Sequence, residues 1–202
     1  MNKNPIKDQD RAEDLLGNWR KYEYVMFPQQ RSIYARLGPK LSGLTVLEAG
    51  CGSGVGSYVL QQWSDSFVAT DKLEANVKFA AQLYCRINFQ VWDICQPWHG
   101  GKADVVVAVE TLEHVGDPCT ALKNLMGAAN KEVWISTPNG RGKPRPPENP
   151  FHVIELTIEE MLSTICLRYG LSQHQVSVLG WEDFQPVPLD TSISPLVYRI
   201  EL

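Results

Sequence analysis

From residue 44 onward, short apolar runs alternate with segments that repeat apolar residues every three to four positions. The apolar runs predict strands at 45–48, 67–71, 87–91, 104–109 and 132–136. The run at 104–109 is continuous and β-branched, as in a strand buried on both faces of a parallel sheet. The segments between the strands predict helices at 54–63, 73–84 and 118–128. This alternation is typical of an α/β fold with a mostly parallel sheet and helices on both faces.

The chain before residue 44 carries a different pattern. An aromatic-rich stretch leads into a predicted helix over 29–41; its aromatic residues are Trp19, Tyr22, Tyr24, Phe27 and Tyr34. We therefore predict an N-terminal cap at 1–43 and a main domain at 44–202. The aromatic residues either close over a ligand as a lid or pack a helix on the sheet.

The C-terminal third is divided by a loop with five prolines at 138–150, which excludes a helix or strand there. A capping box at Thr157 to Glu160 then predicts a helix start. Two final strands are expected at 176–179 and 196–200.

Composition narrows the class of protein. The 202 residues carry 19 Lys and Arg against 23 Asp and Glu, a net charge of -4. That balance disfavours a protein that binds nucleic-acid phosphates or an anionic membrane surface. No apolar run approaches the roughly 20 residues that span a bilayer. We expect one soluble, cytoplasmic domain, and the sequence leaves its oligomeric state open.

Cysteine and histidine spacing bears on metals and disulfides. The five cysteines are scattered and form no Cys-x-x-Cys pair, which favours reduced thiols. The four histidines never stand four residues apart or beside a cysteine pair. We therefore predict no metal site.

The strongest chemical signal is a glycine-rich turn after the first strand. Gly50, Gly52 and Gly54 flank Cys51 and follow Glu48, at the point where a helix begins. Glycines there allow a tight turn and the close approach of a ligand. The spacing does not satisfy the Gly-x-Gly-x-x-Gly/Ala fingerprint of dinucleotide enzymes. A carboxylate beside the turn suits a ligand with an ammonium or sulfonium group.

Two later acids complete the pattern. Asp71 ends the second strand, where a carboxylate can accept both hydroxyls of an adenosine ribose. Asp93 and Ile94 follow the third strand and are placed to bracket an adenine ring. Asp71 could instead cap a helix, and Asp93 could be an ordinary loop residue.

These motifs together resemble the class I S-adenosylmethionine-dependent methyltransferases. Glu48 to Gly54 is similar to the family's first motif, 68–71 to its acid-ended second strand and 92–94 to its adenine-contacting turn. The stretches 108–118, 136–139 and 149–153 are similar to the small-molecule branch, which includes ubiquinone-type O-methylases.

The resemblance implies a Rossmann-like seven-stranded sheet with an antiparallel last strand, and S-adenosyl-L-methionine as the cofactor. It assigns the methionine moiety to Glu48 and to the backbone of Gly50, Cys51, Gly52 and Gly54. It further implies that Asp71 holds the ribose, that Lys72, Asp93 and Ile94 surround the adenine, and that Glu110 lies beneath the sulfonium.

Methyl transfer to an oxygen also requires removal of the acceptor's proton, a task suited to histidine. His114 follows the fourth strand and is the candidate catalytic base, unless it only anchors the loop. His152 precedes the last long helix and is the candidate substrate contact, with loop anchoring as the alternative. Cys119 we interpret as a packing residue.

The sequence therefore predicts a methyltransferase that acts on a small molecule, most simply at oxygen. Three alternatives stay open: a protein or nucleic-acid acceptor, a nicotinamide-dependent oxidoreductase, and a non-catalytic binding module.

Overall fold

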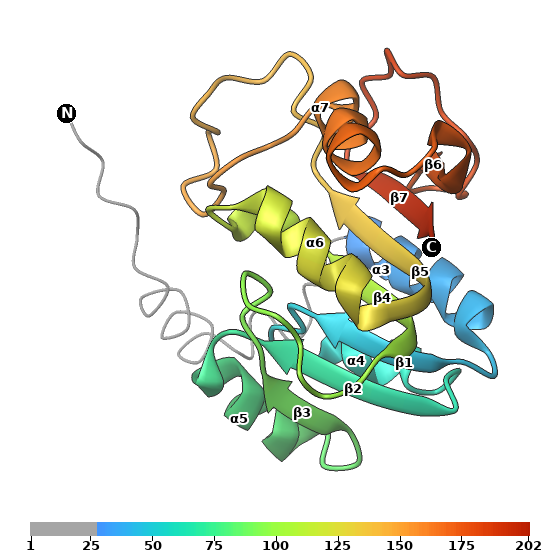
Figure 1. The fold of residues 1–202 in the computed structure, drawn as a ribbon. Helices are drawn as coiled ribbons and strands as arrows, with labels where there is room; N and C mark the ends of the chain where they lie inside the picture. Colours follow the sequence, from blue (N-terminus) through green and yellow to red (C-terminus); the bar gives the residue numbers. More distant parts are fainter. Residues whose placement is uncertain (1–27) are drawn as a thin grey trace.

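The computed structural model describes residues 28–202, which fold around a single sheet (Figure 1). The sheet has seven strands in the order β3-β2-β1-β4-β5-β7-β6. Strands β1 to β5 pair in parallel, whereas β7 runs antiparallel to both β5 and β6. This confirms the Rossmann-like sheet with an antiparallel strand that enters through a hairpin.

The strands lie close to their predicted positions. They span β1 Thr45–Ala49, β2 Ser66–Asp71, β3 Asn88–Val91, β4 Ala103–Val109, β5 Ala129–Thr137, β6 Val176–Gly180 and β7 Leu196–Glu201. The helices span α3 Pro28–Leu37, α4 Val55–Leu60, α5 Glu74–Leu83, α6 Pro118–Ala128 and α7 Ile158–Ser163.

Helices cover both faces of the sheet, and strand residues alternate between them. Along β4, Val105 and Val107 pack with α3 and α4, whereas Val106 and Ala108 pack with α6 and α7. Successive side chains of a strand point to opposite faces, so this run is buried on both sides, as its β-branched composition predicts.

Two helices end before their predicted bounds, and a third changes its form after its predicted start. The α-helix predicted over 29–41 ends at Leu37 and continues as a 3-10 turn over Gly38–Leu41, since Pro39 cannot donate the next helical hydrogen bond. Helix α4 ends at Leu60 instead of residue 63. Helix α7 widens into a π-helix over Thr164–Arg168. The proline-rich loop 138–150 contains neither helix nor strand, as predicted.

The predicted N-terminal cap is described only from residue 28. Its aromatic residues Trp19, Tyr22, Tyr24 and Phe27 lie outside the described residues, so the lid and the 1–43 boundary stay predictions. Tyr34 is buried on the face of the sheet that α3 covers. Within residues 28–202, no helix is long and apolar enough to cross a membrane.

Candidate functional site

The carboxyl ends of four parallel strands meet at one edge of the sheet, where the structure contains a pocket. The loops after β1, β2, β3 and β4 form its walls. Its lining residues are Gly50, Gly52, Asp71, Lys72, Leu73, Asn76, Trp92, Asp93, Ile94, Glu110, Thr111, His114 and Val115. Ligands of open α/β sheets bind at this edge.

The glycine turn brings backbone close to this pocket. Gly50, Gly52 and Gly54 all have positive φ, at 78°, 53° and 83°. A Cβ at Gly50 would lie 2.3 Å from Thr111 Oγ1, so the turn and the loop after β4 touch only because this side chain is absent. At Gly52 a Cβ would meet no protein atom within 4 Å. Its backbone is therefore open to a ligand in the pocket.

Asp71 fixes the glycine turn as well as facing the pocket. Its Oδ2 accepts a hydrogen bond from the backbone N–H of Gly52 at 2.9 Å, and Oδ1 accepts one from Leu73 N–H at 2.9 Å. A carboxylate oxygen can accept more than one hydrogen bond, so these two bonds do not preclude contacts with hydroxyl groups of a ligand. Asp71 therefore combines a structural role with a candidate binding role.

The predicted cofactor residues divide into two groups. Those on the pocket wall are Gly50, Gly52, Asp71, Lys72, Asp93, Ile94 and Glu110. Glu48, Cys51 and Gly54 lie behind it. The side chain of Cys51 packs with Ala69 and Ile87, and Gly54 sits close to Ala80.

Glu48 is fully buried beneath the glycine turn. Its carboxylate accepts hydrogen bonds from Tyr34 Oη at 2.9 Å and from Ser57 Oγ at 2.5 Å. Burial raises its pKa to about 7, although the two hydroxyl donors oppose that shift. Glu48 thus connects α3, β1 and α4 behind the turn, and its side chain is not part of the pocket wall.

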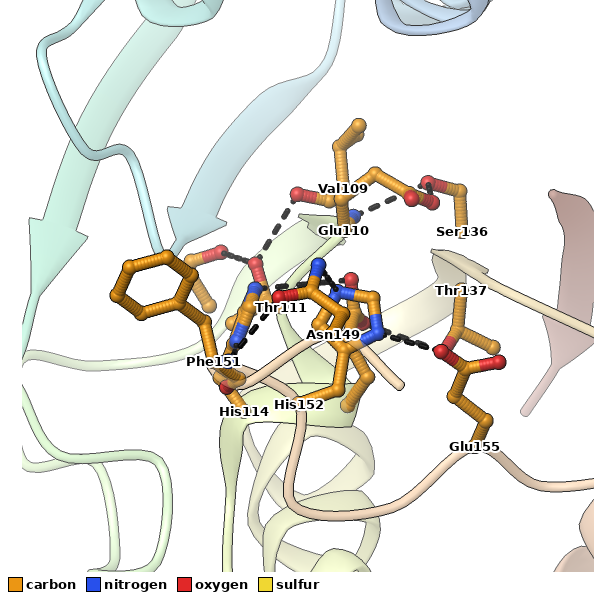
Figure 2. Close-up of polar contacts among 12 residues, drawn as sticks. Val109, Glu110, Thr111, His114, Ser136, Thr137, Asn149, Phe151, His152 and Glu155 are labelled. Atoms are coloured by element: carbon orange, nitrogen blue, oxygen red, sulfur yellow. Dashed lines mark hydrogen bonds and ion pairs between the residues drawn. The ribbon is translucent and has the colours of Figure 1, made fainter. Parts of the chain in front are cut away.

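Glu110 follows β4 in a left-handed conformation, with φ 50°. Its carboxylate accepts a hydrogen bond from Ser136 Oγ at 2.8 Å, at the end of β5 (Figure 2). Burial raises the pKa of Glu110 to about 7, against the effects of Ser136 and Lys143. The pocket therefore holds three acidic side chains, those of Asp71, Asp93 and Glu110, against one lysine. That balance suits a cationic ligand.

His114 lies on the pocket wall in a 3-10 turn over Leu112–His114. Its Nδ1 lies 2.8 Å from the backbone carbonyl of Phe151, which can only accept, so Nδ1 carries the proton (Figure 2). A neutral ring then has its lone pair on Nε2. His114 therefore anchors the loop that holds Phe151, and its role as a base stays a prediction.

His152 is fixed on both sides. Its Nδ1 lies 2.6 Å from Glu155 Oε1, and its Nε2 lies 2.9 Å from Asn149 Nδ2 (Figure 2). The rings of His152 and His114 meet edge to face, with centroids 5.0 Å apart. His152 is not on the pocket wall but stands behind His114.

Sequence reasoning missed a group that only the fold assembles. Among residues 28–202, Glu113, His114 and His152 place one potential metal-ligand atom each within 4.8 Å of one another. The prediction of no metal ligands rested on spacing along the chain, and His152 comes from a distant loop. In the sequence, Glu113 is a single acid with no feature that marks it as a ligand. In the structure its side chain is buried, with 1% exposed. Leu73, Asn76, Thr111 and Val115 were also missed as pocket residues, whereas Trp92 belongs to the stretch 92–94 that the resemblance singled out.

The basic residues of the proline-rich loop have local partners. Arg141 pairs with Glu159, Lys143 with Glu155, and Arg145 with Glu160. These contacts attach the loop to the start of α7 and to the segment before it.

Comparison with known proteins agrees with the fold. A family model described as a methyltransferase domain matches residues 19–171. The chain belongs to this family. The match confirms the resemblance to the class I S-adenosylmethionine-dependent methyltransferases.

Individual relatives with a described activity are about 30% identical to this chain. A probable S-adenosylmethionine-dependent methyltransferase of Mycobacterium tuberculosis is 29% identical over 152 residues, which cover 71% of this chain and 54% of that protein. A ubiquinone biosynthesis O-methyltransferase of Pseudomonas paraeruginosa is 32% identical over 51% of this chain and 48% of its own length. The chain thus spans about half the length of these curated relatives.

Solved structures show the same fold. The N-methyltransferase NodS of Bradyrhizobium japonicum, in complex with S-adenosyl-L-homocysteine, superposes with a TM-score of 0.69 and 18% identity. The match covers 95% of this chain and 96% of NodS.

Proposed function

We propose that this chain binds S-adenosyl-L-methionine in the pocket at the sheet edge and transfers its methyl group to an oxygen of a small molecule. The observation that carries the proposal is the shared pocket wall of the glycine turn, Asp71 and His114. Groups that would bind the cofactor and a candidate base thus line one cavity, which supports the proposal.

The pocket residues fit the cofactor by their chemistry. Asp71 would accept the ribose hydroxyls, and Asp93 with Ile94 would hold the adenine, next to Lys72. Gly52 offers open backbone to the methionine portion. Glu110 would lie near the positive sulfonium, where its ionised form is favoured. Bound S-adenosylmethionine supplies an activated methyl carbon for in-line displacement by the acceptor.

Glu48, Cys51 and Gly54 would act from behind the turn. Glu48 would support the cofactor by holding the turn against Tyr34 and Ser57. Gly54 would allow the turn to pack on α5, where a Cβ would lie 2.9 Å from that of Ala80. The alignment of methyl and acceptor is the main task of such a site, and a rigid turn serves it.

His114 is the proposed catalytic base. The Phe151 carbonyl holds the Nδ1 proton, and Nε2 would take the proton of an acceptor hydroxyl. His152, which Glu155 holds in place, would orient the acceptor. The mildly acidic chain lacks the charge of a nucleic-acid binder, which supports a small-molecule acceptor.

Calorimetric titration with S-adenosylmethionine, S-adenosylhomocysteine and NAD tests the cofactor. We expect the first two to bind at micromolar concentration and NAD not to bind. Asp71→Ala should weaken S-adenosylhomocysteine at least about tenfold, because charge-assisted hydrogen bonds to the ribose are lost. The exposed Asp190→Ala is the matched control and should bind as the unchanged chain does. Binding of NAD alone would favour the oxidoreductase alternative.

Transfer of a labelled methyl group to panels of phenols, alcohols and amines tests the acceptor atom. We expect methyl ethers as products, and His114→Gln should lower turnover by about 10²–10⁴-fold while S-adenosylhomocysteine binding persists. Products methylated only at nitrogen or carbon would contradict the oxygen assignment. Ligand binding without transfer to any class of acceptor, peptides and RNA included, would favour a binding module.

A further inference from the structure

Glu113, His114 and His152 form a compact group beside the pocket. Their candidate ligand atoms lie within 4.8 Å of one another. Glu113 and His114 belong to the turn after β4, whereas His152 comes from the loop before α7. The two segments are joined by backbone hydrogen bonds from Val153 and Ile154 N–H to the Glu113 carbonyl, at 2.8 and 3.2 Å. The fold therefore holds the three side chains together.

Both imidazoles are oriented in the way that metal-binding histidines usually are. His114 directs Nδ1 to the Phe151 carbonyl, and His152 directs Nδ1 to the Glu155 carboxylate. A metal-ligating histidine almost always donates its other N–H to a carbonyl or carboxylate, which fixes the ring and its tautomer. Here each Nδ1 has such a partner, and each Nε2 carries the lone pair.

The third side chain supplies negative charge. Glu113 is 1% exposed, and its Oε2 accepts a hydrogen bond from Thr137 Oγ1 at 3.2 Å. Its Oε1 lies 3.7 Å from His114 Nε2. A buried carboxylate is costly unless a positive charge is near it. A cation between Glu113 and the two rings would interact favourably with this carboxylate.

We propose that Glu113, His114 and His152 bind a divalent first-row transition cation, such as Zn²⁺, through Glu113 Oε1 and the two Nε2 atoms. Two imidazoles with one carboxylate are a donor set that suits such ions, whereas Mg²⁺ and Ca²⁺ prefer oxygen ligands alone. Three protein ligands leave coordination positions for water or a ligand.

Two adjustments accompany binding. Metal–ligand distances of about 2.1 Å require the donor atoms to lie about 3–3.5 Å apart, so the group must contract slightly. The Asn149 amide, which donates to His152 Nε2, must turn away. Its Oδ1 already accepts from Phe151 N–H, so the amide keeps one of its hydrogen bonds.

The role of the cation rests on the proposed function. Because His114 faces the cofactor pocket, a cation on its Nε2 would stand beside a bound acceptor. An acceptor hydroxyl that ligates the cation has a lowered pKa and loses its proton to water. The oxyanion oxygen then forms the bond to the methyl carbon as the carbon–sulfur bond breaks, with its electron pair left on sulfur. In this state the His114 lone pair binds the cation, and His114 orients the acceptor instead of removing its proton.

The test titrates the tag-free full chain with Co²⁺, whose visible absorption reports imidazole coordination, and with Zn²⁺ by calorimetry. We expect one saturable site per chain, with Mg²⁺ in excess failing to compete. His152→Ala and Glu113→Gln should each weaken Co²⁺ at least about 100-fold, because each removes a ligand. His174→Ala, at an exposed histidine outside the group, is the matched control and should bind Co²⁺ unchanged.

S-adenosylhomocysteine affinity of the same variants separates the two proposals. Retained affinity shows that the variant is folded, so a loss of Co²⁺ binding then comes from the missing ligand. No saturable Co²⁺ binding at millimolar concentration, or equal binding by both variants and the unchanged chain, would overturn the cation site and leave the methyltransferase proposal standing. Co²⁺ binding without any binding of S-adenosylhomocysteine would instead contradict the proposed function alone.

Discussion

Glu48 provides a direct test of how burial acts at the glycine turn. We predict that Glu48→Gln changes the pH dependence of folding stability. Burial raises the Glu48 pKa from 4.5 to about 7 in the folded chain. The folded state therefore holds the proton more tightly than the unfolded state between these pH values. By linkage, the contribution of Glu48 to stability falls as pH rises through this window, and it is least favourable above pH 7.

The magnitude follows from the shift. The rise of the Glu48 pKa from 4.5 to about 7 corresponds to about 3 kcal/mol of unfavourable folding free energy once the carboxylate is fully ionised. Between pH 5 and pH 8 about 2–3 kcal/mol of this change takes place. Glutamine does not titrate. Relative to the unchanged chain, the variant should therefore gain about 2–3 kcal/mol of unfolding free energy on going from pH 5 to pH 8.

Urea denaturation of both chains at several pH values measures this difference. Carboxylates distant from position 48 titrate in the same way in both chains, so the difference isolates the titration of Glu48 together with its interaction with Asp71. Glu74→Gln is the control: Lys78 lowers the pKa of this exposed glutamate, so any change should have the opposite sign. A variant-to-parent difference that is constant from pH 5 to pH 8 would refute the argument that Glu48 is desolvated beneath the turn.

Three further outcomes test other parts of the structure. Gly50→Ala should weaken S-adenosylhomocysteine at least about tenfold in calorimetry, because the new Cβ would displace Thr111 and φ is 78°. Unchanged affinity would show that the turn can relax. Leu125→Ala should lower the urea-unfolding free energy by about 2–5 kcal/mol, since this side chain is fully buried; a loss below 1 kcal/mol would argue against a close-packed interface. Arg145→Ala should cost less than about 1 kcal/mol, because its ion pair with Glu160 is half-exposed. A larger loss would mean that the proline-rich loop depends on that pair.

The strands and the pocket edge could be predicted because their signals are local. Strand β4 is apolar from Val105 to Val109, where it is covered on both faces, and the glycine turn stands directly after a strand. Asp71 and Asp93 follow their strands, so parallel topology alone brings them to one edge. Each of these inferences needed no more than the order of residues along one segment and the rule that parallel strands share a direction.

The position of Glu48 required a further step. Side chains alternate along β1, so Glu48 shares a face with Val46, which packs with α3 and α4. Glu48, one residue before the end of β1, therefore points away from α6 and into the layer of Tyr34 and Ser57. The acidity of Glu48 indicated a ligand contact. The alternation of side chains along β1 instead points its carboxylate to the face behind the turn.

The histidine group was beyond sequence reasoning for a different reason. Glu113 and His114 are neighbours, but His152 comes from the loop before α7, which is joined to the turn after β4 by hydrogen bonds from Val153 and Ile154 N–H to the Glu113 carbonyl. No periodicity along the chain encodes a contact made by an irregular loop. Spacing rules search for ligands on one element, so they could not find a set divided between two.

The elements on the two faces of the sheet thus have different roles in the proposed site. On the α3 and α4 face, Glu48 holds the turn that would bind the cofactor. On the other side of the pocket, the loop before α7 fixes His114 through the Phe151 carbonyl and His152 through Glu155. The turn after β4 joins these halves, since Glu110 and His114 both line the pocket. Because the cofactor side rests on strand ends and the acceptor side on a loop, the acceptor side can change among relatives while the fold and cofactor pocket stay the same.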